Sequence, residues 1–119
     1  MRKIKNKKRK LTPFTVLKQD GYTYNEIGEK EVKWVEAFSF EGVLSLQSGD
    51  SKYTNFNTKI EESTHTLICD YHGGIYSLSK NNTRIMAKDM IYDVLLIDNP
   101  DELDVQLEIY LRFVGGQNG

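Results

Sequence analysis

The stretch Leu103–Phe113 reads LDVQLEIYLRF, and its apolar residues recur at every second position. Successive side chains of a strand point to opposite faces of the sheet, so a period of two places these residues on one face. A helix would scatter them around its surface. The stretch predicts a strand whose buried face carries Leu103, Val105, Leu107, Ile109, Leu111 and Phe113.

The same period recurs at even positions between residues 32 and 46. We expect the buried face of this strand to carry Val32, Trp34, Phe38, Phe40, Leu44 and Leu46. Glu36 and Gly42 interrupt the pattern. Because Gly42 has no side chain to pack, it marks a bulge or a tight bend of a barrel.

Shorter segments of strand-forming residues complete the β pattern. They span residues 14–18, 63–71, 83–87 and 90–98. We expect the first of these to end at Gln19-Asp20-Gly21. Lys88-Asp89 has the length of a two-residue hairpin turn. Asn99–Glu102 contains a proline, which presets φ for a turn and lacks the N–H that a central strand needs.

The chain length of 119 residues is close to that of one ordinary domain. We therefore predict an all-β fold, a small antiparallel β-barrel of about six strands, as a single domain over residues 13–117. Closure into a barrel removes exposed strand edges. The predicted barrel has a long loop between strands 2 and 3.

The charges are divided unevenly along the chain. The first ten residues hold seven basic residues and no acidic one, whereas the rest holds nine basic and seventeen acidic residues, a net charge of −8. We expect residues 1–12 to form a flexible basic arm. It could act as a solubilising extension, dock onto an acidic face of a partner or neighbouring copy, or bind phosphates. The candidate docking residues are Lys7, Lys8, Arg9 and Lys10.

The connection from Gln47 to Ile60 has fourteen residues and no sustained pattern. Structureless loops of this length are uncommon in small domains unless they are functional. It is either a disordered insertion or an ordered contact, and Tyr53 and Phe56 favour the contact because interfaces are enriched in aromatic residues.

Residues suited to catalysis are sparse. Cys69 and His65 lie four residues apart on a predicted strand, about 13 Å from each other, and are too far apart for a nucleophile and its base. His72 alone does not make Cys69 a nucleophile, and a buried structural cysteine is the favoured interpretation. One cysteine and two histidines are too few for the usual tetrahedral zinc site. No apolar run approaches the roughly 20 residues of a membrane helix. We expect a binding or assembly protein, not an enzyme, with no cofactor, metal or membrane partner.

Several segments resemble the head closure proteins of long-tailed bacteriophages that infect Gram-positive bacteria, also described as head-tail joining, connector or stopper proteins. The resemblance covers roughly residues 13–117. It rests on residues 41–49 (EGVLSLQSG), 59–65 (KIEESTH), 91–100 (IYDVLLIDNP) and 107–111 (LEIYL), and on Gly115-Gly116-Gln117.

This resemblance implies a subunit of the virion neck, which forms a ring between the portal-bound adaptor and the tail. During assembly the subunit would be in the host cytoplasm. Its partners would be other copies of the chain, the adaptor and portal complex, the tail, and the double-stranded DNA that passes through the channel without sequence-specific contacts. In this family the long loop after the second strand is associated with sealing the channel and meeting neighbouring copies. The loop residues that the resemblance points to are Ser48, Asp50, Tyr53, Asn55, Phe56 and Lys59.

Two alternatives stay open at this point. One is a nucleic-acid-binding barrel of the oligonucleotide-binding type that uses the basic arm. The other is a tail completion or tail terminator subunit, which would contact the tail tube instead of the adaptor.

Overall fold

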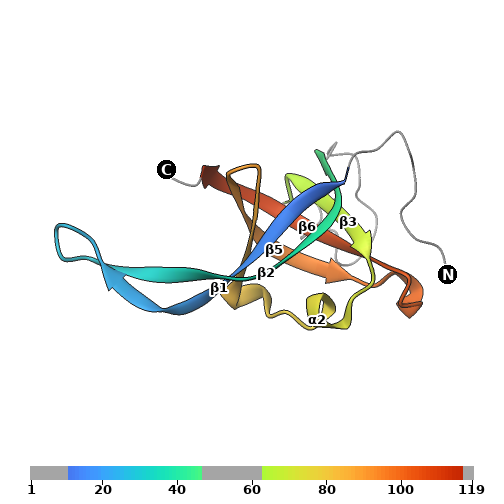
Figure 1. Cartoon of the computed structure of the whole chain (residues 1–119), viewed down its shortest axis with the longest axis horizontal. Helices are drawn as coiled ribbons and strands as arrows, with labels where there is room; N and C mark the ends of the chain where they lie inside the picture. The colour runs from blue at the N-terminus through green and yellow to red at the C-terminus, as the bar shows by residue number, and fades with distance from the viewer. Residues whose placement is uncertain (1–10, 47–62, 117–119) are drawn as a thin grey trace.

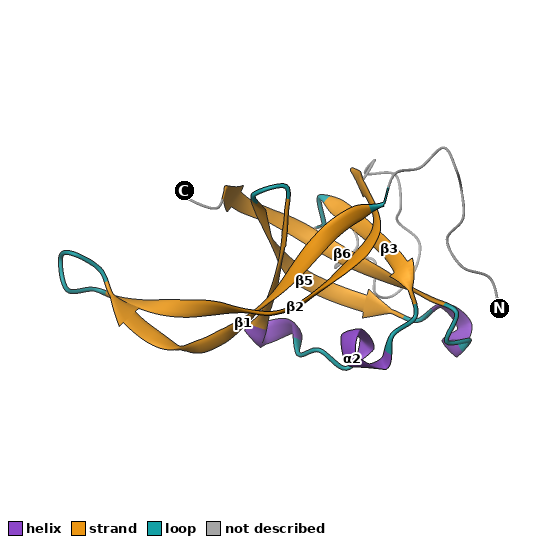
Figure 2. Cartoon of the chain, viewed as in Figure 1, coloured by secondary structure: helices purple, strands orange, loops and turns teal. Residues whose placement is uncertain are grey.

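Strands make up most of the computed structural model, which describes residues 11–46 and 63–116 (Figure 1). The strands are β1 (Thr12–Tyr24), β2 (Lys30–Leu46), β3 (His65–Asp70), β4 (Thr83–Ala87), β5 (Met90–Asp98) and β6 (Gln106–Gly116). The helices in these ranges are short (Figure 2). They are α2 (Gly73–Tyr76) and the 3-10 turns η1 (Lys80–Asn82) and η2 (Pro100–Glu102).

The six strands pair antiparallel and close into a barrel in the order β1-β2-β3-β6-β5-β4. The chain forms two three-stranded meanders, β1 to β3 and β4 to β6, which residues 71–82 connect. Pairing of β3 with β6 and of β1 with β4 closes the ring. The predicted all-β barrel of six antiparallel strands is confirmed. Most of the predicted long loop between β2 and β3 lies in residues 47–62, outside the described residues.

The barrel interior is filled by alternate side chains of the strands. Leu67 of β3 pairs with Ile109 of β6, and both side chains are almost completely buried. The predicted buried face of the last strand is confirmed at its centre, where Leu107 and Leu111 flank Ile109. The other buried members of this core are Phe14, Val16, Cys69, Ile75, Ile85, Ala87, Tyr92 and Val94.

The last strand begins later than predicted, because the turn before it is longer. Asn99 is buried, its side-chain Oδ1 accepts a hydrogen bond from the Asp104 N–H (3.1 Å), and its Nδ2 donates to Asp104 Oδ1 (2.8 Å). These bonds hold the chain in a turn up to Asp104, so Leu103 is 65% exposed. The expectation that Leu103 lies on the buried strand face was wrong.

The predicted buried face of β2 holds only in part. Phe40 and Leu44 pack against the core, whereas Val32, Phe38 and Leu46 are exposed. β2 has 17 residues, and only part of its length belongs to the barrel wall. It pairs with β3 only over residues 43–46.

Gly42 occupies the position where β2 passes from β1 to β3. It pairs with Thr12 of β1, and the next residue, Val43, pairs with Ile68 of β3. A Cβ atom at Gly42 would lie 2.7 Å from the Ile68 carbonyl oxygen and 2.7 Å from Leu67 Cδ1. Such distances do not occur in folded chains without a shift, so β2 and β3 approach each other closely at Gly42. The bulge or tight bend expected at this residue stays a prediction.

The expected end of β1 at Gln19-Asp20-Gly21 was wrong, because this segment is a bulge inside a longer strand. The register with β2 shifts between Gln19 and Tyr22, and Gly21 has a φ of +78°. A glycine in the left-handed region is typical of bulges that bend and twist a strand. Beyond it β1 and β2 continue as a two-stranded hairpin that projects from the barrel (Figure 1).

The two-residue turn predicted at Lys88-Asp89 is confirmed. Ala87 pairs with Met90, and the two turn residues have φ values of +53° and +65°. Left-handed backbone at both positions is what the tight turns of antiparallel hairpins require, although Asn and Gly favour it more than Lys and Asp do.

Candidate interaction surface

The sequence-predicted site residues lie outside the described residues. These are Ser48, Asp50, Tyr53, Asn55, Phe56 and Lys59 of the predicted loop and Lys7, Lys8, Arg9 and Lys10 of the predicted arm. A candidate surface is therefore built from residues 11–46 and 63–116.

A groove with a volume of about 390 Å³ lies on the outer face of the barrel, at the base of the projecting hairpin. Strand register brings its residues together: Leu17 of β1 pairs with Arg84 of β4 and Glu36 of β2, and Met86 of β4 pairs with Ile91 of β5. We call this site the outer groove. It is lined by Leu17, Trp34, Glu36, Arg84, Met86, Ile91, Val114, Gly115 and Gly116.

One apolar side chain, that of Leu17, is buried in the outer groove. Val16 and Leu17 are consecutive residues of β1 and point to opposite faces of the sheet, yet both are buried. Val16 packs in the barrel interior, whereas Leu17 lines the groove on the outside. The outer face of β1 is therefore apolar here as well as the inner face.

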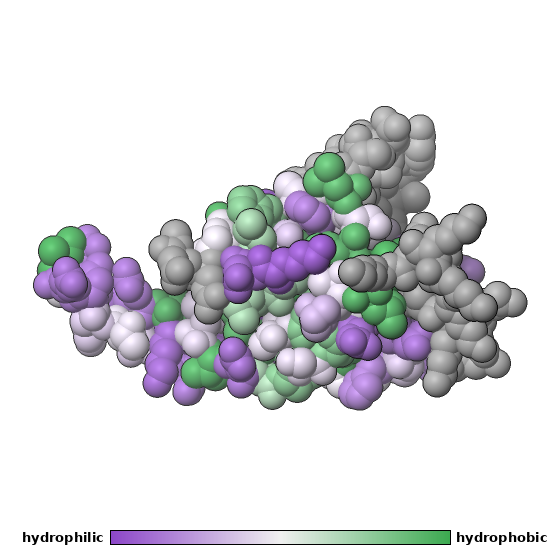
Figure 3. Space-filling view, turned by 45° about the horizontal axis from the view of Figure 1, so that its top comes forward, coloured by the Kyte–Doolittle hydropathy of each residue, from purple (hydrophilic) through white to green (hydrophobic). Residues whose placement is uncertain are grey.

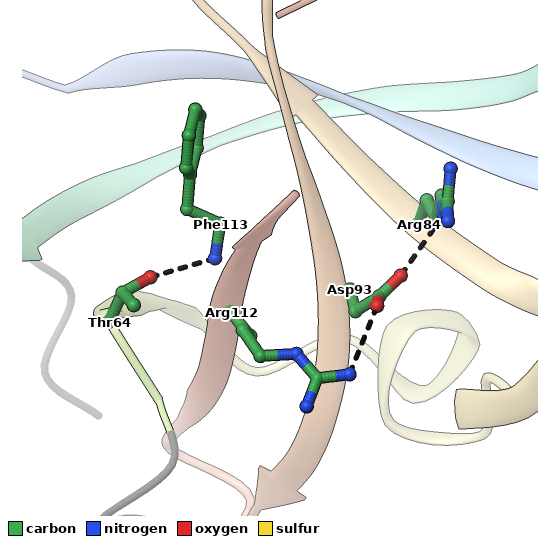
Figure 4. Close-up of polar contacts among 5 residues, drawn as sticks. All are labelled: Thr64, Arg84, Asp93, Arg112 and Phe113. Atoms are coloured by element: carbon green, nitrogen blue, oxygen red, sulfur yellow. Dashed lines mark hydrogen bonds and ion pairs between the residues drawn. The ribbon is translucent and has the colours of Figure 1, made fainter. Parts of the chain in front are cut away.

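An ion network borders the outer groove. Arg84 Nε donates to Asp93 Oδ1 at 3.0 Å, and Arg112 donates from a terminal nitrogen to Asp93 Oδ2 at 3.3 Å, so two guanidinium groups share one carboxylate (Figure 4). The Arg84 guanidinium also lies over the Trp34 ring, 4.7 Å from its centroid. Arg84 thus connects the barrel wall of β4 and β5 to the base of the hairpin.

The hairpin continues the apolar character of the groove on one of its faces. Tyr22 pairs with Val32, and Tyr24 pairs with Lys30. Lys30 Nζ lies 4.2 Å from the centroid of the Tyr22 ring, which places these side chains on one face. Val32 is two residues from Trp34 and so shares its face of β2. We call the face with Tyr22, Tyr24 and Val32 the apolar hairpin face.

The tip of the hairpin is held by one side chain. Asn25 Oδ1 accepts hydrogen bonds from the backbone N–H groups of Ile27 (3.0 Å) and Glu29 (2.8 Å), and its Nδ2 donates to the carboxylates of Glu29 (3.1 Å) and Glu31 (3.3 Å). Ile27 is consequently displayed at the tip and is 77% exposed. Figure 3 shows hydrophobic surface at this projecting end of the molecule.

A second polar contact fixes the start of β3. Thr64 Oγ1 accepts a hydrogen bond from the Phe113 N–H at 2.8 Å (Figure 4). The same oxygen lies 2.9 Å from His65 Nδ1, and the His65 ring contacts the Tyr92 ring edge-on. Burial lowers the pKa of His65 from its ordinary value. His65 therefore makes the packing and polar contacts expected of a structural histidine.

The surroundings of Cys69 do not favour a reactive thiol. Burial raises the pKa of the Cys69 thiol to about 12, with a smaller contribution from the neighbouring Asp70 carboxylate. His72 caps α2 instead, where its Nδ1 accepts a hydrogen bond from the Gly74 N–H at 3.0 Å. The interpretation of Cys69 as a buried structural residue is confirmed by its position in the core.

Sequence reasoning missed the hairpin, although a signal was present. Asn25 and Gly28 suit a tight connection, and Tyr22, Tyr24 and Val32 alternate with polar residues on both sides of it. The polar pair Gln19-Asp20 before Gly21 is typical of a turn, so the strand was expected to end there and the alternation beyond it was not recognised.

Clusters of metal-ligating side chains and long apolar helices were looked for in the described ranges. Residues 11–46 and 63–116 hold no group of three or more His, Cys, Asp or Glu side chains placed to bind a metal ion. Within the same ranges no helix has both the length and the apolar character required to span a membrane.

Comparisons with known proteins bear on the fold alone. Neither a family model nor a curated protein matches the chain. Among solved structures it is similar to the solution structure of protein SF1141 from Shigella flexneri 2a, with a TM-score of 0.58 and 14% sequence identity, over 92% of this chain and 96% of that one. The described barrel therefore has a counterpart of nearly the same length with a very different sequence.

Proposed function

We propose that the chain is a structural subunit of a bacteriophage neck, which forms a ring between the portal-adaptor complex and the tail, seals the DNA channel and provides the surface to which the tail attaches. This proposal starts from the sequence resemblance to head closure proteins. The small closed β-barrel agrees with the fold that the resemblance implies.

The observation that carries the proposal is the uncovered apolar surface formed by the outer groove and the apolar hairpin face. Tyr24 is 70% exposed, Tyr22 51% and Ile27 77%, and they lie on a hairpin that projects from the barrel. Isolated two-stranded hairpins are only marginally stable in water. An exposed apolar surface on such an element is typical of a contact with another protein.

The charge of the barrel suits a channel through which DNA passes without binding. The described residues hold seven basic and fourteen acidic residues, a net charge of −7. An acidic surface repels phosphates and so lowers non-specific affinity. The same charge argues against the alternative of a nucleic-acid-binding barrel whose strands supply the binding face.

The test is electron microscopy of particles made by a genome that encodes this chain, after deletion of its gene. We expect heads that package DNA, lose it again and carry no tails, and complementation with the gene should restore intact particles. Unfilled procapsids would contradict the proposal. Heads that keep their DNA beside defective tails would favour the tail completion alternative instead.

A binding measurement separates the nucleic-acid alternative. We expect the purified full-length chain to give no electrophoretic shift of DNA at physiological salt. A tight, salt-sensitive shift that disappears when residues 1–10 are removed would favour the oligonucleotide-binding interpretation.

A further inference from the structure

We propose that the apolar hairpin face of one copy docks into the outer groove of a second copy of this chain, and that this contact links the subunits. The inference rests on the proposed function, because it assigns the subunit contact of the ring. It concerns described residues only and is independent of the predicted loop at residues 47–60.

The shape of the molecule favours contact with another copy over contact within the chain. The described part extends 50 Å along its longest axis but only 28 and 26 Å across it, and the hairpin forms one end of the long axis (Figure 1). β1 pairs with β4 only up to Lys18, so no third strand within residues 11–46 and 63–116 pairs with the hairpin. Among the described residues, the side chains of its apolar face stay exposed.

The charges of the two surfaces are complementary. The tip, residues 25–31, holds Glu26, Glu29 and Glu31 against the single base Lys30, a net charge of −2. At the groove, Arg84 and Arg112 share Asp93, and Lys80 lines an adjoining pocket with Asp93 and Arg112. With Glu36 of the groove included, this border carries a net charge of +1.

This border differs in charge from the rest of the described residues, which hold four basic and twelve acidic residues. Three of the seven basic residues in the described ranges lie there, although acidic residues outnumber basic ones two to one in those ranges. An acidic tip would be steered toward this border and away from the rest of the surface. Seating of the tip would then place Tyr22, Tyr24 and Val32 against the apolar lining of the groove.

The contact is heterologous, because the hairpin and the groove are different parts of the surface. Every copy offers one of each, so the contact can repeat from copy to copy. Repeated head-to-tail contacts close into a ring when the rotation between copies divides a full turn. The inferred contact therefore has the symmetry that a neck ring needs.

Cysteine cross-linking tests the contact in the full-length chain. The double variant Tyr24→Cys/Val114→Cys places one thiol on the hairpin and one in the groove, both at exposed positions. The native thiol of Cys69 is buried and does not interfere. The matched control is Tyr24→Cys/Leu103→Cys, whose second position is more exposed than Val114 (65% against 45%) and lies beside η2, outside the groove. Each variant is treated with a short bis-maleimide at a series of protein concentrations up to about 1 mM.

The pattern of products separates the inference from the proposed function. We expect a ladder of dimers, trimers and larger species for the hairpin-groove pair, at a yield at least about tenfold above the control. Dimers as the largest product, at that yield, would support the contact but contradict a ring. A yield no higher than that of the control at every concentration would overturn the inference, while the particle phenotype would still decide the proposed function.

A charge exchange provides a second, independent readout. We expect Glu29→Arg in the cross-linking background to lower the initial rate by roughly five- to tenfold, since rim charges act mainly on association. Addition of Arg112→Glu should recover most of the rate, because it restores opposite signs across the contact. Equal rates in all three proteins would overturn the charge pairing on which the inference rests.

Discussion

Both halves of β1 carry large apolar or aromatic side chains, but in opposite environments. In residues 14–17 the large apolar side chains are buried, with Phe14 and Val16 in the core and Leu17 in the outer groove. In residues 18–24 the tyrosines Tyr22 and Tyr24 are exposed. Residues 15–18 of β1 lie between β2 and β4, whereas the residues after Lys18 pair with β2 alone. The difference shows that an apolar stripe on a strand predicts a covering partner without saying whether that partner belongs to the same chain.

The largest expected difference between the two regions is in the free energy of unfolding after truncation of an apolar side chain. We expect Leu67→Ala in the barrel to cost about 3 kcal/mol, because it leaves a cavity in a closed core. Ile27→Ala at the hairpin tip should change stability by less than about 0.5 kcal/mol. Urea denaturation followed by circular dichroism measures both. Similar losses for the two variants would mean that the hairpin tip is covered in the free protein.

A second comparison concerns crowding between strands. We expect Gly42→Ala to destabilise the barrel by about 2 kcal/mol, because its Cβ would collide with the Ile68 carbonyl oxygen and with Leu67. Gly115→Ala is the matched control, since a Cβ there has open space around it, and its effect should stay within about 0.5 kcal/mol. The loss of stability of each variant is measured from its melting temperature relative to the unchanged protein. An unchanged melting temperature for Gly42→Ala would show that β2 and β3 separate easily.

The pH dependence of stability tests whether the barrel interior is dry. Cys69 ionises at its ordinary pKa of 9.0 in the unfolded chain but only near 12 in the fold, so the unfolded state loses the proton first. Stability is therefore full below pH 9 and falls as the pH rises. We expect a loss of about 1 kcal/mol between pH 8 and 10.

The control for this pH dependence is Cys69→Ala, which should show a clearly smaller loss over the same interval, in denaturant titrations at each pH. Burial also raises the pKa values of Tyr92 and Tyr110, so part of the loss remains above pH 10. Identical pH profiles for the two proteins would mean that the thiol is not desolvated.

The smallest expected effect is a gain in stability at the two-residue turn between β4 and β5. Lys88 and Asp89 both have left-handed backbone, which Asn-Gly adopts more readily. We expect the double substitution Lys88→Asn/Asp89→Gly to stabilise the barrel by about 0.5 kcal/mol, since it relieves backbone strain. Thermal unfolding measures the shift. A loss of stability would indicate that one of these side chains makes a contact that outweighs the strain.

The sequence predicted the fold, but it did not point to the outer groove or to the hairpin. The alternation in Leu107–Leu111 was sufficient for the last strand, because a period of two depends on local geometry only. The outer groove could not be predicted, because it needs the register of β1, β2, β4 and β5 to bring Leu17, Trp34 and Arg84 together. The hairpin was missed because Gly21 was interpreted as the end of a strand and is a bulge inside one.

Local patterns were thus enough to establish that this chain makes about six antiparallel strands and where most of them lie. Only the tertiary structure decided which apolar side chains are covered, because burial depends on the neighbouring strands and not on the strand itself. Leu17 and Tyr22 illustrate this. Both residues lie on β1. Leu17 has β4 beside it and is buried, whereas Tyr22 lies beyond the end of the pairing with β4 and is exposed.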